Sequence, residues 1–270
     1  SGTGTLTQQG TGTTTLTSTA NNYTGATQVA QGTLQAGATN TFSSSSAYTV
    51  ATGATLDLAG YNQTLASLNN SGMVKLSSNG GGTPGTVLKV TGAYVGNGGT
   101  LGLSTVLAAD GSATDKLLLS GSNAVASGST IIQITNAGGL GGQTMGTGIQ
   151  VVGTENGGSL QANSFTLAGE HVDAGAYEYR LFQTAQGATL QSTDTLLAYR
   201  SEVPLMSALP AQLRQADMSM LGDMHRRMGD DNVQASNGAG TTSADLGQNR
   251  RVWGRILRTD PTIHQQGTVT

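Results

Sequence analysis

Residues 21–38 read NNYTGATQVAQGTLQAGA, a stretch with no charged residue, much threonine and glycine, and few apolar side chains. It contains the unit GTLQAG at residue 32, and variants of that unit follow as GATLDLAG at residue 53, SGMVKLSS at residue 71 and GGTLGLST at residue 98. Each variant is a glycine, a short alternating strand and a turn. A helical repeat would need an apolar residue every three to four positions, so the pattern predicts repeated strands.

The spacing of these units favours a β-solenoid. The apolar residues that mark them, Leu34, Leu56, Val74 and Leu101, are 22, 18 and 27 residues apart, a loose period near 20. In a solenoid each coil adds a strand about 4.8 Å from the last, and small polar side chains stack in register. A narrow interior needs few apolar residues per strand. The alternative is a disordered Gly/Ser/Thr-rich segment, which the recurring strand alternation disfavours.

Composition excludes several classes of protein. The 270 residues include no cysteine, which excludes a disulfide scaffold and a thiolate metal site. The net charge is −3 and no Lys/Arg cluster with interleaved aromatics occurs, so we expect no nucleic-acid partner. No apolar run reaches the roughly 18 residues of a membrane helix, and the first residues carry no signal-peptide pattern. We therefore expect the chain to be an excised fragment.

Charge and periodicity divide the chain into segments. Residues 200–270 carry 8 arginines and 7 acids, whereas only Asp57, Lys75 and Lys89 are charged before residue 105. Denser apolar runs in residues 105–199 predict that this segment holds the largest core and folds first. A stripe from Leu205 to Met228, in steps of three and four, predicts a helix over 204–228. The predicted segments are solenoid rungs at 1–104, a cap region at 105–199, a hinge and helix at 200–232, a polar linker at 233–250 and a strand at 251–270.

The end of the cap region predicts a β-hairpin. AYEYRLFQ alternates, is followed by the turn TAQG, and continues as the second strand ATLQS. Such a hairpin would cover the open strand edge of the last coil. The residues expected to lock this folding cap are Tyr177, Tyr179, Leu181 and Phe182.

Catalytic patterns are weak. No G-x-S-x-G or H-E-x-x-H motif occurs, and His171, His225 and His264 fall on separate predicted elements. In GEHVD, His171 has Glu170 and Asp173 nearby, which suits either a metal or acid/base cluster or a polar turn, and we favour the turn. The sequence therefore predicts no enzyme, no catalytic residue, no cofactor and no metal.

The order of the pieces resembles a known family. TTTLTSTANNYTGATQVAQGTLQAG resembles the passenger-associated repeat of type V autotransporters, with matches at Leu16, Thr17, Asn22, Tyr23, Thr24, Gly25, Thr27, Val29, Gly32, Thr33 and Leu34. The stretch from DKLLLSG to HVDAGAYEYRL resembles the autochaperone region of pertactin-like passengers. LLAYRSEVPLMSALPAQLRQ resembles the hinge and linker helix, and RRVWGRI resembles the first strand of the translocator barrel.

The resemblance implies an all-β fold: a right-handed parallel β-helix with a C-terminal capping hairpin, followed by a linker α-helix and the first strand of an outer-membrane β-barrel. It implies a non-enzymatic passenger segment that helps its own passenger fold and cross the outer membrane. Asn232 and Asn249 are candidate cleavage positions, with solvated linker asparagines as the alternative. The implied partners are the chain's own barrel and the barrel assembly machinery, with a monomeric passenger at the cell surface and the C-terminal end in the outer membrane. Two other functions stay open: an adhesin binding host surface ligands through its loops, and a fragment of a surface enzyme.

Overall fold

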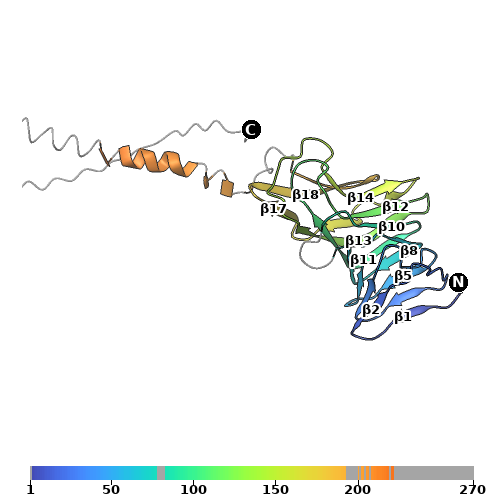
Figure 1. Cartoon of the computed structure of the whole chain (residues 1–270). Helices are drawn as coiled ribbons and strands as arrows, with labels where there is room; N and C mark the ends of the chain where they lie inside the picture. The colour runs from blue at the N-terminus through green and yellow to red at the C-terminus, as the bar shows by residue number, and fades with distance from the viewer. Residues whose placement is uncertain are drawn as a thin grey trace, which may run out of the picture. The chain divides into compact units, whose positions relative to one another are not determined.

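The computed structural model describes residues 2–77, 83–192 and 200, and helical residues at 202–203, 205–206, 208–218 and 220–221. The chain divides into two compact units, Ser1–Arg200 and Ser201–Thr270. In the described part of the first unit the regular structure consists of strands (Figure 1). This confirms the all-β prediction for that unit.

Most of these strands lie in three parallel stacks, an arrangement compatible with a β-helix. The first stack contains β1 (Leu6–Gln8), β3 (Thr27–Val29), β5 (Ala47–Val50), β8 (Ser67–Asn70), the first parts of β11 (Tyr94–Thr105) and β13 (Val125–Asn136), and β15 (Ser159–Leu160). The second contains β2 (Thr13–Leu16), β4 (Thr33–Ala36), β6 (Thr55–Asp57), β9 (Met73–Lys75), the second parts of β11 and β13, and β16 (Phe165–Leu167). The third contains β7 (Gln63–Leu65), β10 (Val87–Val90), β12 (Lys116–Ser120) and β14 (Ile149–Glu155). One passage of the chain through the three stacks is called a coil.

The predicted repeat units pair with one another in register. In the second stack Leu34 lies opposite Leu56, which lies opposite Val74, and the series continues through the two longer strands. The full ladder is Leu34, Leu56, Val74, Leu101, Ile132 and Leu167. The first four members are the positions that define the repeat in the sequence. The last two steps are longer, because the later coils carry longer loops.

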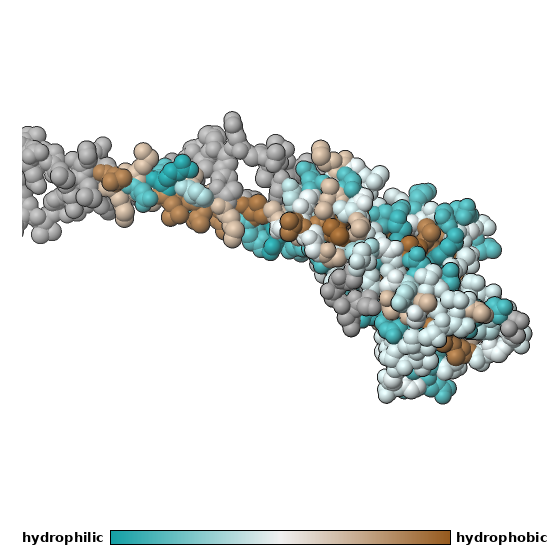
Figure 2. Space-filling model, in the orientation of Figure 1, coloured by the Kyte–Doolittle hydropathy of each residue, from teal (hydrophilic) through white to brown (hydrophobic). Residues whose placement is uncertain are grey.

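The ladder explains how so few apolar residues suffice. Every member is buried, and all belong to one core cluster that runs from Val29 to Leu190. Each such side chain touches its counterparts in the coils before and after it, so a single apolar residue per strand is covered on both sides. On the face in Figure 2 the β unit is mostly white and teal, the colours of intermediate and low hydropathy.

The apolar core is divided evenly along the described part of this unit. Eighteen buried apolar residues precede residue 105 and sixteen follow it. The prediction that residues 105–199 hold the largest core is therefore wrong. The apolar surplus of that segment faces solvent instead: Ile131, Leu140, Met145 and Phe182 are 39, 88, 85 and 42% exposed.

Glycines form the corners between the first and second stacks. β11 and β13 each run through both stacks and bend at Gly98 and Gly128, both with φ near +77°. A Cβ atom on Gly128 would overlap the carbonyl oxygen of Gly96 in the neighbouring coil, whereas one on Gly98 would meet open space. Backbone of successive coils therefore meets at Gly128 with no room for a side chain.

The last coil is followed by antiparallel strands. β18 (Tyr177–Thr184) and β19 (Gly187–Gln191) form the predicted hairpin, and β17 (His171–Ala174) pairs with the far side of β18. β19 pairs antiparallel with β14 and occupies the strand edge that β14 does not use for β12.

Helical residues of the second unit from 205 onward fall in the range where the apolar stripe predicts a helix, and those at 202–203 precede it. Leu205, Leu209 and Leu213 of that stripe are 68, 51 and 58% exposed. The described helical residues within 202–221 form no helix both long and apolar enough to cross a bilayer. The predicted polar linker at 233–250 and barrel strand at 251–270 lie outside the described residues.

Candidate functional site

The antiparallel cap is built around Tyr179. This residue lies in the middle of β18 and is fully buried. Its hydroxyl accepts a hydrogen bond from the N–H of Gly142 (2.8 Å) and lies 2.9 and 2.7 Å from the carbonyl oxygens of Ala108 and Gly142. Burial raises the pKa of Tyr179 above the ordinary tyrosine value. The hydroxyl therefore joins the hairpin to two loops of earlier coils.

The other predicted cap residues occupy different environments. Tyr177 and Leu181 are partly buried and pack against the core cluster, as their alternation with Tyr179 predicts. Phe182 points the other way and is 42% exposed, so it is not part of the buried set. A folding role for these four side chains stays a prediction.

A second contact joins the end of the hairpin to the same loop. The Ser192 hydroxyl accepts from the N–H of Thr144 (2.9 Å), and the Thr144 hydroxyl accepts from the N–H of Ser192 (2.8 Å). Both residues are buried. The β13–β14 loop is thus held at two places by residues of the cap, although no sequence motif marks this pair.

Asp110 holds the remaining part of that loop. Its carboxylate accepts hydrogen bonds from the N–H groups of Met145 (2.7 Å), Gly146 (3.0 Å) and Gly148 (2.6 Å). These bonds, led by the one from Met145, lower the pKa of Asp110 below its ordinary value. No sequence pattern marks this residue as special, because a single aspartate before a glycine is typical of an ordinary turn.

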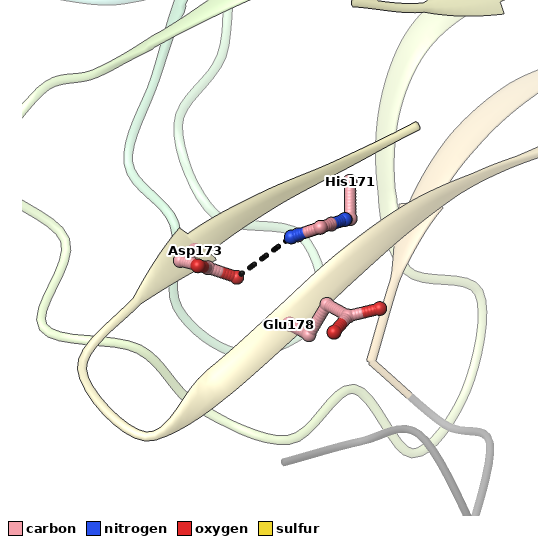
Figure 3. A group of neighbouring side chains, drawn as sticks. All are labelled: His171, Asp173 and Glu178. Carbon is pink, nitrogen blue, oxygen red and sulfur yellow. Dashed lines mark ion pairs between the residues drawn. The ribbon is translucent and has the colours of Figure 1, made fainter. Parts of the chain in front are cut away.

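Ionisable side chains gather on the outer face of β17 and β18. One ligand atom from each of His171, Asp173 and Glu178 lies within 4.8 Å of the others (Figure 3). Glu178 is paired with Arg180 at 2.5 Å and Asp173 with Arg200 at 3.3 Å, so each carboxylate already has a cationic partner. The arrangement is a charge-balanced network that ties Arg200 to the hairpin.

This network differs in one member from the cluster considered in the sequence. Glu178, rather than Glu170, completes the group, because antiparallel pairing places it directly opposite Asp173. Glu170 lies in the preceding turn with φ of 69°. Glu178 could have been identified from the sequence only if the antiparallel register of β17 and β18 had been known.

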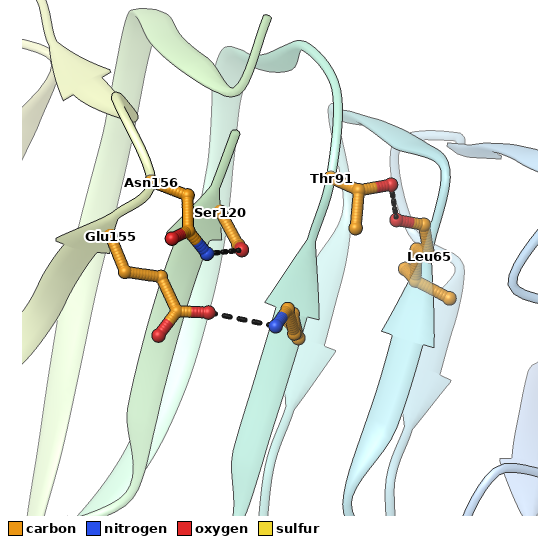
Figure 4. Close-up of polar contacts among 6 residues, drawn as sticks. Leu65, Thr91, Ser120, Glu155 and Asn156 are labelled. Carbon is orange, nitrogen blue, oxygen red and sulfur yellow. Dashed lines mark hydrogen bonds and ion pairs between the residues drawn. The ribbon is translucent and has the colours of Figure 1, made fainter. Parts of the chain in front are cut away.

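Polar contacts also connect coils along the third stack (Figure 4). Glu155 accepts from Lys89 at 2.7 Å, a contact that spans from β14 to β10 and lowers the pKa of Glu155. Asn156 donates to the Ser120 hydroxyl at 3.2 Å. The candidate cleavage positions Asn232 and Asn249 lie outside the described residues.

Two family models match parts of this architecture. The passenger-associated-transport-repeat matches residues 6–36, which contain β1 to β4. The Autochaperone Domain Type 1 matches residues 63–181, from β7 into β18. The second match includes Tyr179 and the loop that it holds.

Curated relatives agree with these matches. The adhesin BmaC autotransporter of Brucella suis is 33% identical over 213 residues, 69% of this chain and 6% of the relative. The probable autotransporter YfaL of Escherichia coli is 37% identical over 129 residues, 47% of this chain and 10% of the relative. The chain belongs to the type V autotransporter passengers.

This passenger segment therefore carries an autochaperone region, as the resemblance implied. The uncharacterized protein YuaQ of Escherichia coli is also similar, 40% identical over 124 residues, 46% of this chain and 8% of the relative. The passenger segment spans a tenth or less of the length of each of these three relatives. Membership of the autotransporter family implies a location at the cell surface or outer membrane.

Proposed function

We propose that the autochaperone region promotes the folding and outer-membrane translocation of its own passenger, and that the segment is not an enzyme. The observation that carries this proposal is the pairing of β19 with the outer edge of β14. An unpaired final strand would leave an open edge and an uncovered core end. With this edge of β14 covered by β19, the coil that contains β14 supplies a defined surface on which the preceding coil pairs.

The mechanism follows from parallel stacking. A folded coil presents an ordered row of backbone donors and acceptors, so the neighbouring coil docks by edge pairing and then offers the same surface to the next. Folding outside the membrane then opposes return of the chain through the pore. Translocation would be biased by folding free energy without a nucleotide-driven motor.

The finer architecture belongs to the same proposal. The three parallel stacks support a right-handed parallel β-helix, since parallel strand connections are almost always right-handed. The helix within 202–221 is proposed to link this β-helix to the chain's own translocator barrel, which the barrel assembly machinery would insert. The passenger would then stand at the bacterial surface, with the C-terminal end in the outer membrane.

The test is surface display with the cap weakened. The chain is exported as a fusion between an epitope-tagged reporter and the barrel of an established autotransporter. In the double variant Tyr179→Gln and Leu181→Gln, two inward-facing side chains become polar, which breaks the contacts to the core and to the β13–β14 loop. We expect surface epitope to fall at least about tenfold, a change of roughly 1.4 kcal/mol, with normal barrel insertion.

The matched control replaces two exposed apolar residues outside the predicted folding cap, as Tyr61→Gln and Ile131→Gln. These side chains are 41 and 39% exposed, so display should stay close to the unmodified level. Normal display of the Tyr179/Leu181 variant would contradict the folding role, and the autochaperone region would then act only as a spacer.

Adhesion is the second candidate. The favouring observation is that the relative matching the largest part of this chain among the three described carries the name adhesin. Binding of the exported fusion to host cells, compared with the barrel alone, would support adhesion by this segment. Equal binding of the two would assign any adhesive activity to other parts of such proteins.

A further inference from the structure

Asp115 is a fully buried carboxylate immediately before β12. Its Oδ1 accepts hydrogen bonds from the N–H groups of Gly85 (3.0 Å) and Thr86 (2.9 Å). Its Oδ2 accepts from the Ser77 hydroxyl (2.6 Å) and the Ser104 N–H (2.8 Å). Both oxygens therefore have two donors.

Its partners among the described residues are all neutral donors. A buried carboxylate is costly unless it is fully hydrogen-bonded, and bonds to an ionised acceptor are stronger than neutral ones. The burial of Asp115 is therefore compensated only when all four donors are in place. A preceding coil docked one residue out of register would leave this charge inside the protein with the Ser104 N–H of its own coil but without the other three donors.

All four donors precede Asp115 in the sequence. Ser77 follows β9, and Gly85 and Thr86 precede β10, so these three lie in the coil before that of Asp115, whereas Ser104 lies at the end of β11 in the same coil as Asp115. Two backbone bonds reinforce the same corner: the N–H of Asp115 donates to Ser104 and that of Lys116 donates to Thr86. The carboxylate thus joins a corner of one coil to the same corner of the coil before it.

We propose that Asp115 is a positioning residue for folding, which fixes the register of the coil containing β9 and β10 on the coil that enters β12. The assignment rests on the proposed function, since it requires the cap side to fold first. Asp115 and Ser104 would then be in place before the three donors of the earlier coil arrive, and correct docking would complete the hydrogen bonds to the carboxylate.

The test is refolding of the whole 270-residue chain from urea, followed by pulse-labelling hydrogen exchange. This method reports separately on β4–β9 and on β12–β19. In Asp115→Asn an amide N–H₂ faces donors of the earlier coil. We expect protection of β4–β9 to form about tenfold more slowly, with little change in the unfolding rate, as for a contact made in the transition state. Protection of β12–β19 should form at the unmodified rate.

Two further variants make the outcome decisive. Asp57→Asn is the control, because Asp57 is also mostly buried and accepts from Ala59 and Gln35, but within upstream coils. It should chiefly raise the unfolding rate. Ser77→Ala removes one donor and should slow formation of β4–β9 about threefold, which decides the matter if Asp115→Asn does not fold.

Three results would overturn the assignment: an unchanged refolding rate in either Asp115→Asn or Ser77→Ala, an effect of these variants confined to unfolding, or the same kinetic pattern in Asp57→Asn. None of these results bears on surface display of the Tyr179/Leu181 variant. Normal display of that variant would instead reject the proposed function, whatever Asp115 does.

Discussion

At the scale of single residues, polar side chains hold the corners where strands turn. Gln63 accepts from the N–H of Phe42 (2.9 Å) and donates to the carbonyl of Ala38 (2.7 Å), and Tyr179 and Asp110 play the same part in the cap. Backbone groups in such turns lie outside the strand ladders, so side chains supply the missing partners. Loop order in this molecule is therefore sensitive to the ionisation of individual residues.

Asp110 gives a prediction of pH dependence. Its folded pKa is depressed, so its contribution to loop order is complete above the unfolded value, near 3.9, and is lost as the pH falls through the lower folded value. We expect pepsin cleavage at Leu140 and Met145, normalised to a peptide substrate, to rise as the pH falls from 4 toward 2. This range lies below the unfolded aspartate pKa of about 3.9, where Asp110 becomes protonated.

Asp110→Asn provides the comparison for this prediction. An asparagine has one acceptor oxygen and no charge, so the variant should be cleaved readily at all these pH values and should show little further rise. A steep rise in the variant equal to that of the unmodified chain would assign the pH dependence to other groups.

The residue scale is also where sequence-based prediction reached least far. Tyr179 was found because strand alternation identifies an inward-facing aromatic residue. Asp110 and Asp115 were missed, because their partners, apart from the Ser77 hydroxyl, are backbone N–H groups up to 38 residues away. Such partners leave no side-chain pattern in the sequence.

At the scale of elements, the repeat predicted the four strands of the second stack that carry Leu34, Leu56, Val74 and Leu101, because the same alternation recurs in each of these coils. The continuous β11 and β13 were not anticipated, although GNGGT and ASGST contain the glycines at which they bend. A glycine inside an alternating run reads equally as a turn or as a bend within one strand.

The two bends give a matched pair of substitutions. Gly98 and Gly128 have the same φ, so replacement by alanine imposes the same left-handed penalty of about 1–2 kcal/mol at each. Only at Gly128 would the new Cβ also overlap backbone of the neighbouring coil. We expect urea unfolding to show Gly128→Ala to be less stable than Gly98→Ala by about 1–3 kcal/mol. Equal losses of stability in the two variants would mean that the coils can move apart at Gly128 without a cost in free energy.

At the scale of the whole molecule, stability cannot be assigned to the cap by its apolar content, because buried residues are spread evenly along the ladder. What differs between the two ends is burial, together with pairing in the third stack. Among the described residues, β1 and β2 at one end and β15 and β16 at the other each pair on one side only, but β14 is paired on both sides whereas β7 is not. Leu6 and Leu16 in β1 and β2 are only partly buried, whereas Leu160 and Leu167 in β15 and β16 are buried. Edge strands of a one-dimensional array open first, since opening them breaks one interface rather than two.

Native-state hydrogen exchange of this 270-residue segment by itself should therefore show protection that rises from β1 and β2 toward β12 and β14. Leu56→Ala, which leaves a cavity in the ladder and costs about 2–5 kcal/mol, should extend this opening, so that β3 to β6 exchange with β1 and β2 while β12, β14 and β19 keep their protection. Leu190→Ala, in the strand that covers β14, should instead reduce protection along the whole array, because every upstream coil depends on the coil that it stacks against. If Leu56→Ala lowered protection equally in all strands, the array would unfold as one cooperative unit, and directional growth from the cap would lose its physical basis.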